Sequence, residues 1–143
     1  MLHLSGIGSL AIGNNIHDQE HVQLVAEQPM AVTPGKGLTG GAMYRYVGDI
    51  DELNNNVNIR SRIEAVLITT STDGCIGLLM LVLPTVDADT LITELRILFG
   101  EEEVMSPLNG NMVFVWKRPN GLMKTMLLLP EEEAEYCHLI YLD

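Results

Sequence analysis

The stretch RSRIEAVLITTSTDGCIGLLMLVLP, residues 60–84, decides the fold class. Its first part supplies β-branched residues as far as Thr70, the run Ser71-Thr72-Asp73-Gly74 is rich in turn formers, and an apolar run continues from Cys75 to Leu83. Runs of this kind on either side of turn residues are typical of paired strands. The stretch therefore predicts a β-hairpin that ends at Pro84, because proline cannot donate the next hydrogen bond of a strand ladder.

The residues that follow Pro84 predict one main helix, over about 88–99. In TVDADTLITELRILFG, residues 85–100, Asp87 or Asp89 can serve as the N-cap and Gly100 as the C-cap. Between these ends, apolar residues recur at helical spacing, at Leu91, Ile92, Leu95, Leu98 and Phe99.

A second hairpin is predicted over about 111–129. Its turn is RPNG, residues 118–121, where proline has the φ of a turn's second position and glycine accepts a positive φ. The last residues, YCHLIYLD, predict a further strand. The fold class is therefore α+β in a single domain of 143 residues, a mostly antiparallel sheet built from two hairpins with one main helix.

The two halves of the chain differ in composition. Residues 1–48 contain eight of the thirteen glycines and little charge, and we expect a loop-rich N-terminal part there. Residues 59–143 should form the regular α+β core on which that part packs.

Both faces of the predicted strands are apolar. In the second hairpin Met112, Phe114 and Trp116 alternate with Val113 and Val115. In the first hairpin the same alternation separates two sets, Leu79, Leu81 and Leu83 from Leu78, Met80 and Val82. A strand with two apolar faces is covered on both sides, yet the sequence predicts one long helix. Either the glycine-rich N-terminal part covers the second face, or another protein does.

Charge and composition restrict the partners. The chain has 19 acidic and 8 basic residues, a formal charge of −11, which repels nucleic-acid backbones and anionic lipids and favours a protein with a basic surface. No apolar run is long enough for a membrane helix, and the N-terminus is a poor signal peptide. Two cysteines do not make a disulfide framework, so we expect a cytoplasmic protein with reduced thiols.

The glycine-rich stretch TPGKGLTGGAM, residues 33–43, contains a literal G-x-G-x-x-G pattern. A dinucleotide site needs a helix after this loop, but AMYRYV, residues 42–47, alternates as a strand does. We therefore expect the loop to join two strands. A small-molecule or nucleotide site in this loop remains an alternative, and the residues that would form it are Gly35, Lys36, Gly37, Thr39 and Gly40.

HDQEH, residues 17–21, matches the inverted zincin signature H-x-x-E-H. A small metal-dependent hydrolase that uses His17, Glu20 and His21 is the second alternative, and it needs both histidines on one face of a helix, which could run over 18–28. The sequence favours neither a metal nor a cofactor, and no catalytic residue is predicted.

The favoured interpretation is a non-enzymatic, acidic protein-binding protein, an inhibitor, adaptor or chaperone, that self-associates as a homodimer or larger oligomer. We expect the partner to contact a set of acidic and aromatic side chains, Glu101, Glu102, Glu103, Trp116, Glu131, Glu132 and Glu133.

Overall fold

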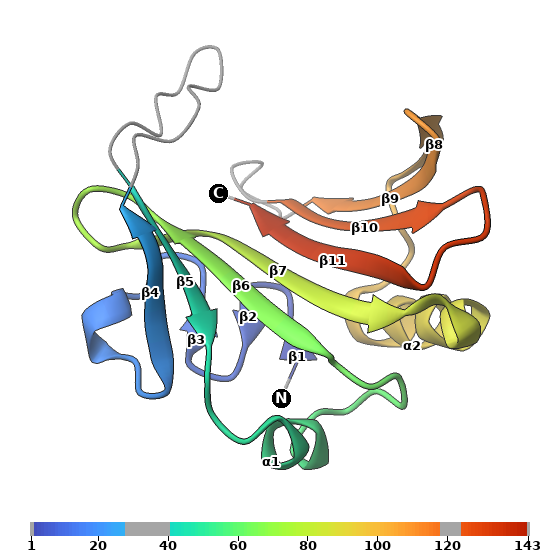
Figure 1. The fold of residues 1–143 in the computed structure, drawn as a ribbon. Coiled ribbons are helices and arrows are strands. Elements are labelled where there is room, and N and C mark those ends of the chain that lie inside the picture. Colours follow the sequence, from blue (N-terminus) through green and yellow to red (C-terminus); the bar gives the residue numbers. More distant parts are fainter. Residues whose placement is uncertain (1, 28–40, 118–123, 143) are drawn as a thin grey trace.

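A computed structural model describes residues 2–27, 41–117 and 124–142 (Figure 1). Within them the chain forms an eight-stranded sheet, in which every neighbouring pair is antiparallel, and a three-stranded sheet. The large sheet has the order β4 (Val22–Glu27), β5 (Ala42–Tyr46), β6 (Ala65–Thr70), β7 (Ile76–Pro84), β11 (Tyr136–Leu142), β10 (Lys124–Pro130), β9 (Asn111–Lys117) and β8 (Val104–Leu108). The predicted α+β class, a mostly antiparallel sheet with one main helix, is confirmed.

Both predicted hairpins are present. Strands β6 and β7 are joined by a tight turn in which the amide of Gly74 donates to the carbonyl of Ser71 at 3.0 Å. Strands β9 and β10 pair from Lys117↔Lys124 onward, and the predicted RPNG turn falls in residues 118–123, outside the described part of the chain. The predicted C-terminal strand is β11, which lies between β7 and β10 and so unites the two hairpins in one sheet.

The main helix, α2 (Ala88–Phe99), follows the 3-10 turn η2 (Thr85–Asp87) and occupies the predicted residues. Its apolar side chains Leu91 and Leu95 are fully buried. Gly100 ends the helix at φ 88° and its amide donates to the carbonyl of Arg96, as expected of a C-terminal glycine. Asp87 stands at the N-cap position, although its side chain makes no capping hydrogen bond.

The N-terminal part is more regular than predicted. Three two-residue strands, β1 (Leu2–His3), β2 (Gly6–Ile7) and β3 (Leu10–Ala11), form the small sheet, and the 3-10 turn η1 (Ile16–Asp18) follows. Beyond them β4 and β5 extend the large sheet. The described residues of the N-terminal part thus contain strands, and the two-residue strands are too brief to show a two-residue period in the sequence.

The small sheet is fixed to the large one by backbone hydrogen bonds. The amide of Gly13 donates to the carbonyl of Ile76, and the amide of Ile76 donates to the carbonyl of Asn14. Gly6 is required at its position, since a Cβ there would come within 2.1 Å of the Leu10 carbonyl oxygen. The short helix α1 (Ile50–Asn55) leads from β5 toward β6, capped by the carboxylate of Asp49.

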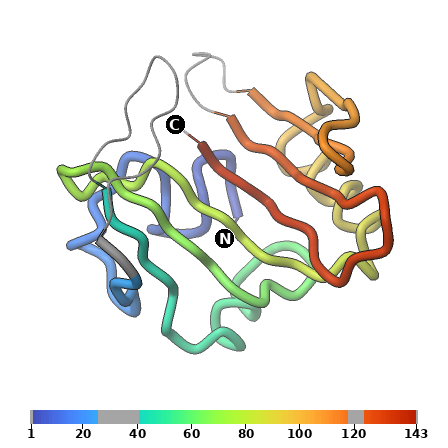
Figure 2. Tube along the Cα trace, turned by 45° about the horizontal axis from the view of Figure 1, so that its top comes forward, coloured from blue at the N-terminus to red at the C-terminus, as the bar shows by residue number. Residues whose placement is uncertain are grey.

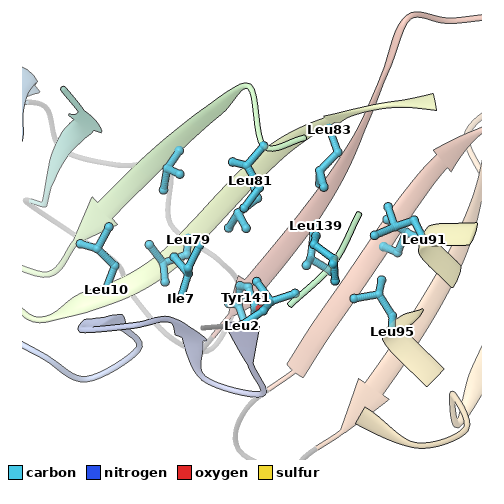
Figure 3. Packing of buried hydrophobic residues seen from close by; sticks show 14 of the residues in the cluster. Leu2, Ile7, Leu10, Leu79, Leu81, Leu83, Leu91, Leu95, Leu139 and Tyr141 are labelled. Atoms are coloured by element: carbon cyan, nitrogen blue, oxygen red, sulfur yellow. The ribbon is translucent and has the colours of Figure 1, made fainter. Parts of the chain in front are cut away.

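The core lies between the large sheet and three elements on one side of it, namely α2, α1 and the small sheet (Figure 3). Leu79 and Tyr141 face the N-terminal residues Leu2 and Ile7, while Leu139 faces the helix at Leu91. The core-facing leucines of β7 and β11 are fully buried. The small sheet and the main helix therefore share the covering of the same face of the sheet.

Candidate functional site

The other face of the large sheet is apolar and partly exposed. The alternation predicted from the sequence is confirmed, because Leu79 and Leu81 are fully buried while Leu78 and Met80 keep some exposure. We call this surface the open face and define it by the outward side chains of β6, β7, β9, β10 and β11. These are Leu67, Leu78, Met80, Val82, Val113, Val115, Met126, Leu128, His138, Ile140 and Leu142.

The open face is continuous because its residues pair across the strands. One row runs through directly paired positions, Leu67, Met80, Ile140, Met126 and Val115. A second row contains Val82, His138, Leu128 and Val113. Paired side chains on one face of a sheet stand about 5 Å apart, so the first row is an unbroken apolar stripe and the second is an apolar stripe interrupted by His138.

The described part of the N-terminal region does not cover this face. In Figures 1 and 2 the N-terminal residues that contain β1–β3 lie behind the central strands of the large sheet, on the side where Leu2 and Ile7 pack with Leu79 and Tyr141. Residues 28–40 of that region lie outside the described part of the chain, so both alternatives for the second face, cover by the N-terminal part and cover by another protein, stay predictions. Two side chains of the open face, Ile140 and Val113, are only 8% and 5% exposed.

The two ends of the open face differ in charge. Lys117 and Lys124, which are both exposed, sit directly opposite each other where β9 ends and β10 begins. Like charges in paired positions are unfavourable in an isolated sheet. The opposite end of β10 leads into the exposed acidic turn that contains Glu131, Glu132 and Glu133.

Further acidic groups lie beside Tyr136 at that second end. Tyr136 begins β11 and is 40% exposed. The charge of Glu135 and a hydrogen bond with it, together with the more distant Glu64, raise the pKa of the Tyr136 hydroxyl. At strands β9 and β10 the open face is therefore basic at one end, apolar in the middle and acidic at the other end.

Trp116, predicted to bind a partner, is a core residue. Its side chain is 2% exposed, its ring packs edge-on against Phe99 with centroids 5.7 Å apart, and its Nε1 donates to the carbonyl of Gly100 at 2.8 Å. No indole surface is left for a partner, so we do not retain Trp116 as a contact residue.

One residue of the acidic triplet 101–103, Glu102, forms an ion pair within the chain. Arg96 holds both carboxylate oxygens of Glu102, at 2.8 and 2.6 Å. This hydrogen-bonded pair lowers the pKa of the Glu102 carboxyl and raises that of the Arg96 guanidinium. Glu101 and Glu103 are exposed, as are Glu131, Glu132 and Glu133.

The candidate ligand-binding residues Gly35, Lys36, Gly37, Thr39 and Gly40 lie outside the described residues. The elements on either side of them are described: β4 and β5 are antiparallel neighbours, so the segment joins two strands as predicted. A strand rather than a helix follows Gly41, which is not the arrangement that a dinucleotide fingerprint needs.

The HDQEH segment is not helical. His17 lies in η1, His21 has a φ of 61°, and β4 occupies residues 22–27 where a helix over 18–28 was considered. His17 and His21 therefore do not share a helical face, which the inverted zincin chemistry requires. Among the residues that the structure describes, no group of three or more His, Cys, Asp or Glu side chains could hold a metal ion.

An acidic pocket of about 540 Å³ lies between the small sheet and α1, and sequence reasoning missed it. Its charged lining comes from two segments distant in sequence, Asp18, Glu20 and His21 on one side and Asp49 and Glu52 on the other. Tyr46 also lines it, and burial, followed by the charges of Glu52 and Asp49, raises the pKa of its hydroxyl. Each of the two segments contributes only two acidic residues to the pocket, so neither segment alone has a sequence pattern that predicts it.

The cysteines show no activation. Both are free, and burial in β11 raises the pKa of the Cys137 thiol to about 11, which suppresses the thiolate form. Cys75 is half-buried next to the turn between β6 and β7. This agrees with small apolar side chains rather than nucleophiles.

Comparison of the chain with models of known protein families, with curated proteins and with solved structures finds no match. None of the helices in the described residues is long and apolar enough to span a membrane. The arguments for function therefore rest on the surfaces described above.

Proposed function

We propose that the chain is a non-enzymatic protein-binding protein and that the open face is its docking surface. The observation that supports this proposal is the two adjoining rows of paired side chains, apolar except for His138, on a face that no described helix covers. Sheets with two apolar faces bury both of them. A contiguous, partly exposed apolar patch is typical of protein interaction sites.

The side chains of the open face suit a partner that is itself a folded surface. Leucine and methionine dominate the central strands, where Leu78, Met80, Met126 and Leu128 remain partly exposed. Methionine adapts its shape to a partner at low cost, and leucine supplies apolar area. A sheet face of this composition fits another sheet or a helix better than a small molecule, which needs a concave site.

The acidic surface has a separate role in this proposal. The net charge of −11 favours encounter with a partner that also carries a basic surface. Exposed ion pairs contribute about 1 kcal/mol or less and are screened by salt, whereas a buried apolar anchor contributes about 2 kcal/mol or more. We therefore assign affinity to the open face and association rate to the acidic residues.

A pair of charge insertions tests the docking surface. Met80→Glu places a carboxylate at the centre of the open face, and Ile97→Glu places one at a side chain of α2 that is already 79% exposed. The wild type, each variant and a blank matrix are used to retain proteins from the native host, and the retained proteins are quantified by mass spectrometry. Proteins retained by the wild type and by Ile97→Glu should be lost from Met80→Glu; equal retention by both variants would contradict the assignment of the open face.

A further inference from the structure

The open face has the charge pattern of a surface that complements itself. Its basic end carries Lys117 and Lys124, and its acidic end leads into the turn with Glu131, Glu132 and Glu133. Both charged groups flank the same strand, β10, one at its start and the other just after its end. A surface of this kind attracts a copy of itself when the two copies run in opposite directions.

We propose that a second copy of this chain covers the open face, packed face to face about a two-fold axis that lies in the interface and perpendicular to the strands. This inference rests on the proposed role of the open face as a docking surface. In this arrangement β10 of one copy crosses β10 of the other in the opposite direction. Two sheets pack in this way with about 10 Å between them and with their strands about 30° apart.

The direction of packing follows from the charges. With the axis across the strands, Lys124 of one copy lies over the acidic turn of the other, and symmetry repeats the contact at the opposite end. With an axis that runs along the strands between β9 and β10, Lys117 and Lys124 would instead face the same lysines of the other copy. The first arrangement pairs opposite charges at both ends, and the second pairs like charges at both ends.

The apolar rows also match in the first arrangement. The centre of β10 is Leu127, whose own side chain points into the core, so the axis passes between Met126 and Leu128. The row that contains Met126 in one copy then packs against the row that contains Leu128 in the other. His138 lies in the second row, between Val82 and Leu128, and therefore faces apolar side chains of the opposite copy.

The area of the face suffices for a dimer. Five strands at about 4.8 Å spacing and three outward positions per strand give a face of roughly 24 by 20 Å. Two such faces bury on the order of 1,000 Å² before the charged ends are added, which reaches the lower range of specific protein interfaces. Interdigitation of leucine and methionine side chains increases the buried area further.

Charge reversal at the two ends tests the packing. One variant combines Lys117→Glu with Lys124→Glu, and the other combines Glu131→Lys, Glu132→Lys and Glu133→Lys, all at exposed positions. Dimerisation is measured by sedimentation velocity at constant physiological salt, and the mixtures are also analysed by native mass spectrometry. Far-UV circular dichroism controls for folding.

The antiparallel dimer predicts a definite set of outcomes. The wild type should dimerise at tens of micromolar, each variant alone about tenfold more weakly, and an equal mixture of the two variants should form heterodimers about as strongly as the wild type. Met80→Glu should weaken the dimer by at least tenfold, whereas Ile97→Glu should not change it. The wild type should not dimerise more strongly with the Lys117→Glu, Lys124→Glu variant than with itself.

Three results would overturn this inference. Preferred pairing of the wild type with the Lys117→Glu, Lys124→Glu variant would show that the basic ends face each other. Failure of the two charge-reversed variants to form heterodimers would show that the proposed contacts between the basic and acidic ends do not form. A monomeric wild type at tens of micromolar would exclude a second copy on the face, and if Met80→Glu still lost its retained proteins, the docking surface itself would stand with a different occupant.

Discussion

Two neighbouring residues of β7 provide a direct test of which face of the sheet is covered within one chain. Leu81 points into the core and is fully buried, whereas Met80 points to the open face and is partly exposed. Both are truncated to alanine, so that the strand, the backbone hydrogen bonds and the size of the change are closely matched. The difference between the two variants then reports the environment of each side chain.

The expected free energies differ several-fold. Truncation of a fully buried leucine removes its transfer free energy and leaves a cavity, so Leu81→Ala should lower the free energy of unfolding by about 3 kcal/mol. For a chain of this size that corresponds to a decrease of roughly 6–12 °C in Tm. Met80→Ala should cost about 1 kcal/mol or less in the monomer, because its side chain already contacts solvent.

The assay is urea unfolding followed by the fluorescence of Trp116, which is the single tryptophan of the chain. It is run at low micromolar and again at tens of micromolar protein, because a dimer adds stability by mass action. Met80→Ala should lose stability mainly at the higher concentration, and Leu81→Ala equally at both. If Met80→Ala cost as much as Leu81→Ala in dilute solution, the second face would be covered by the chain itself and the open face would not exist.

Three further predictions follow from the contacts described above. Arg96 lowers the pKa of the Glu102 carboxyl, so the contribution of this ion pair to stability is present above the ordinary carboxyl pKa and is lost as pH falls through the lowered value. Glu102→Gln should therefore lower the free energy of unfolding by about 1 kcal/mol at pH 7 and make it less dependent on pH on the acid side, as measured by urea unfolding from pH 3 to 7. Trp116→Phe removes the donor to Gly100 and leaves a void beside Phe99, so thermal unfolding should show a loss of about 2 kcal/mol, and an unchanged Tm would contradict the buried position of the indole. Replacement of the exposed glutamates 101, 103 and 131–133 by glutamine should slow association with a basic partner several-fold in stopped-flow or surface-based kinetics while the dissociation rate stays the same; a faster dissociation would place those carboxylates inside the contact.

The sequence by itself determined the local elements. Alternation with a two-residue period in 60–84 and 111–129 is visible because each strand is long enough to repeat it, and the residues between β6 and β7 favour a turn. Helix α2 was predictable because its apolar spacing and Gly100 act over a few residues. That both faces of the central strands are apolar also follows from the alternation alone.

Only the tertiary structure decided how these elements are placed. The position of β11 between β7 and β10 depends on pairing between residues more than fifty positions apart, such as Tyr141 with Leu79, which no local pattern encodes. The two-residue strands of the small sheet contribute Leu2, Ile7 and Leu10 to the core, and the residues after β3, Gly13 and Asn14, hydrogen-bond to Ile76 of β7, so they depend on tertiary contacts rather than on their own propensity. Trp116 could point to the core or to a partner with the same alternation, and its burial against Phe99 was settled only when α2 was placed against β9. For the same reason the sequence shows two apolar faces, while the side on which the helix and the small sheet pack, and therefore which face stays open, is a property of the assembled fold.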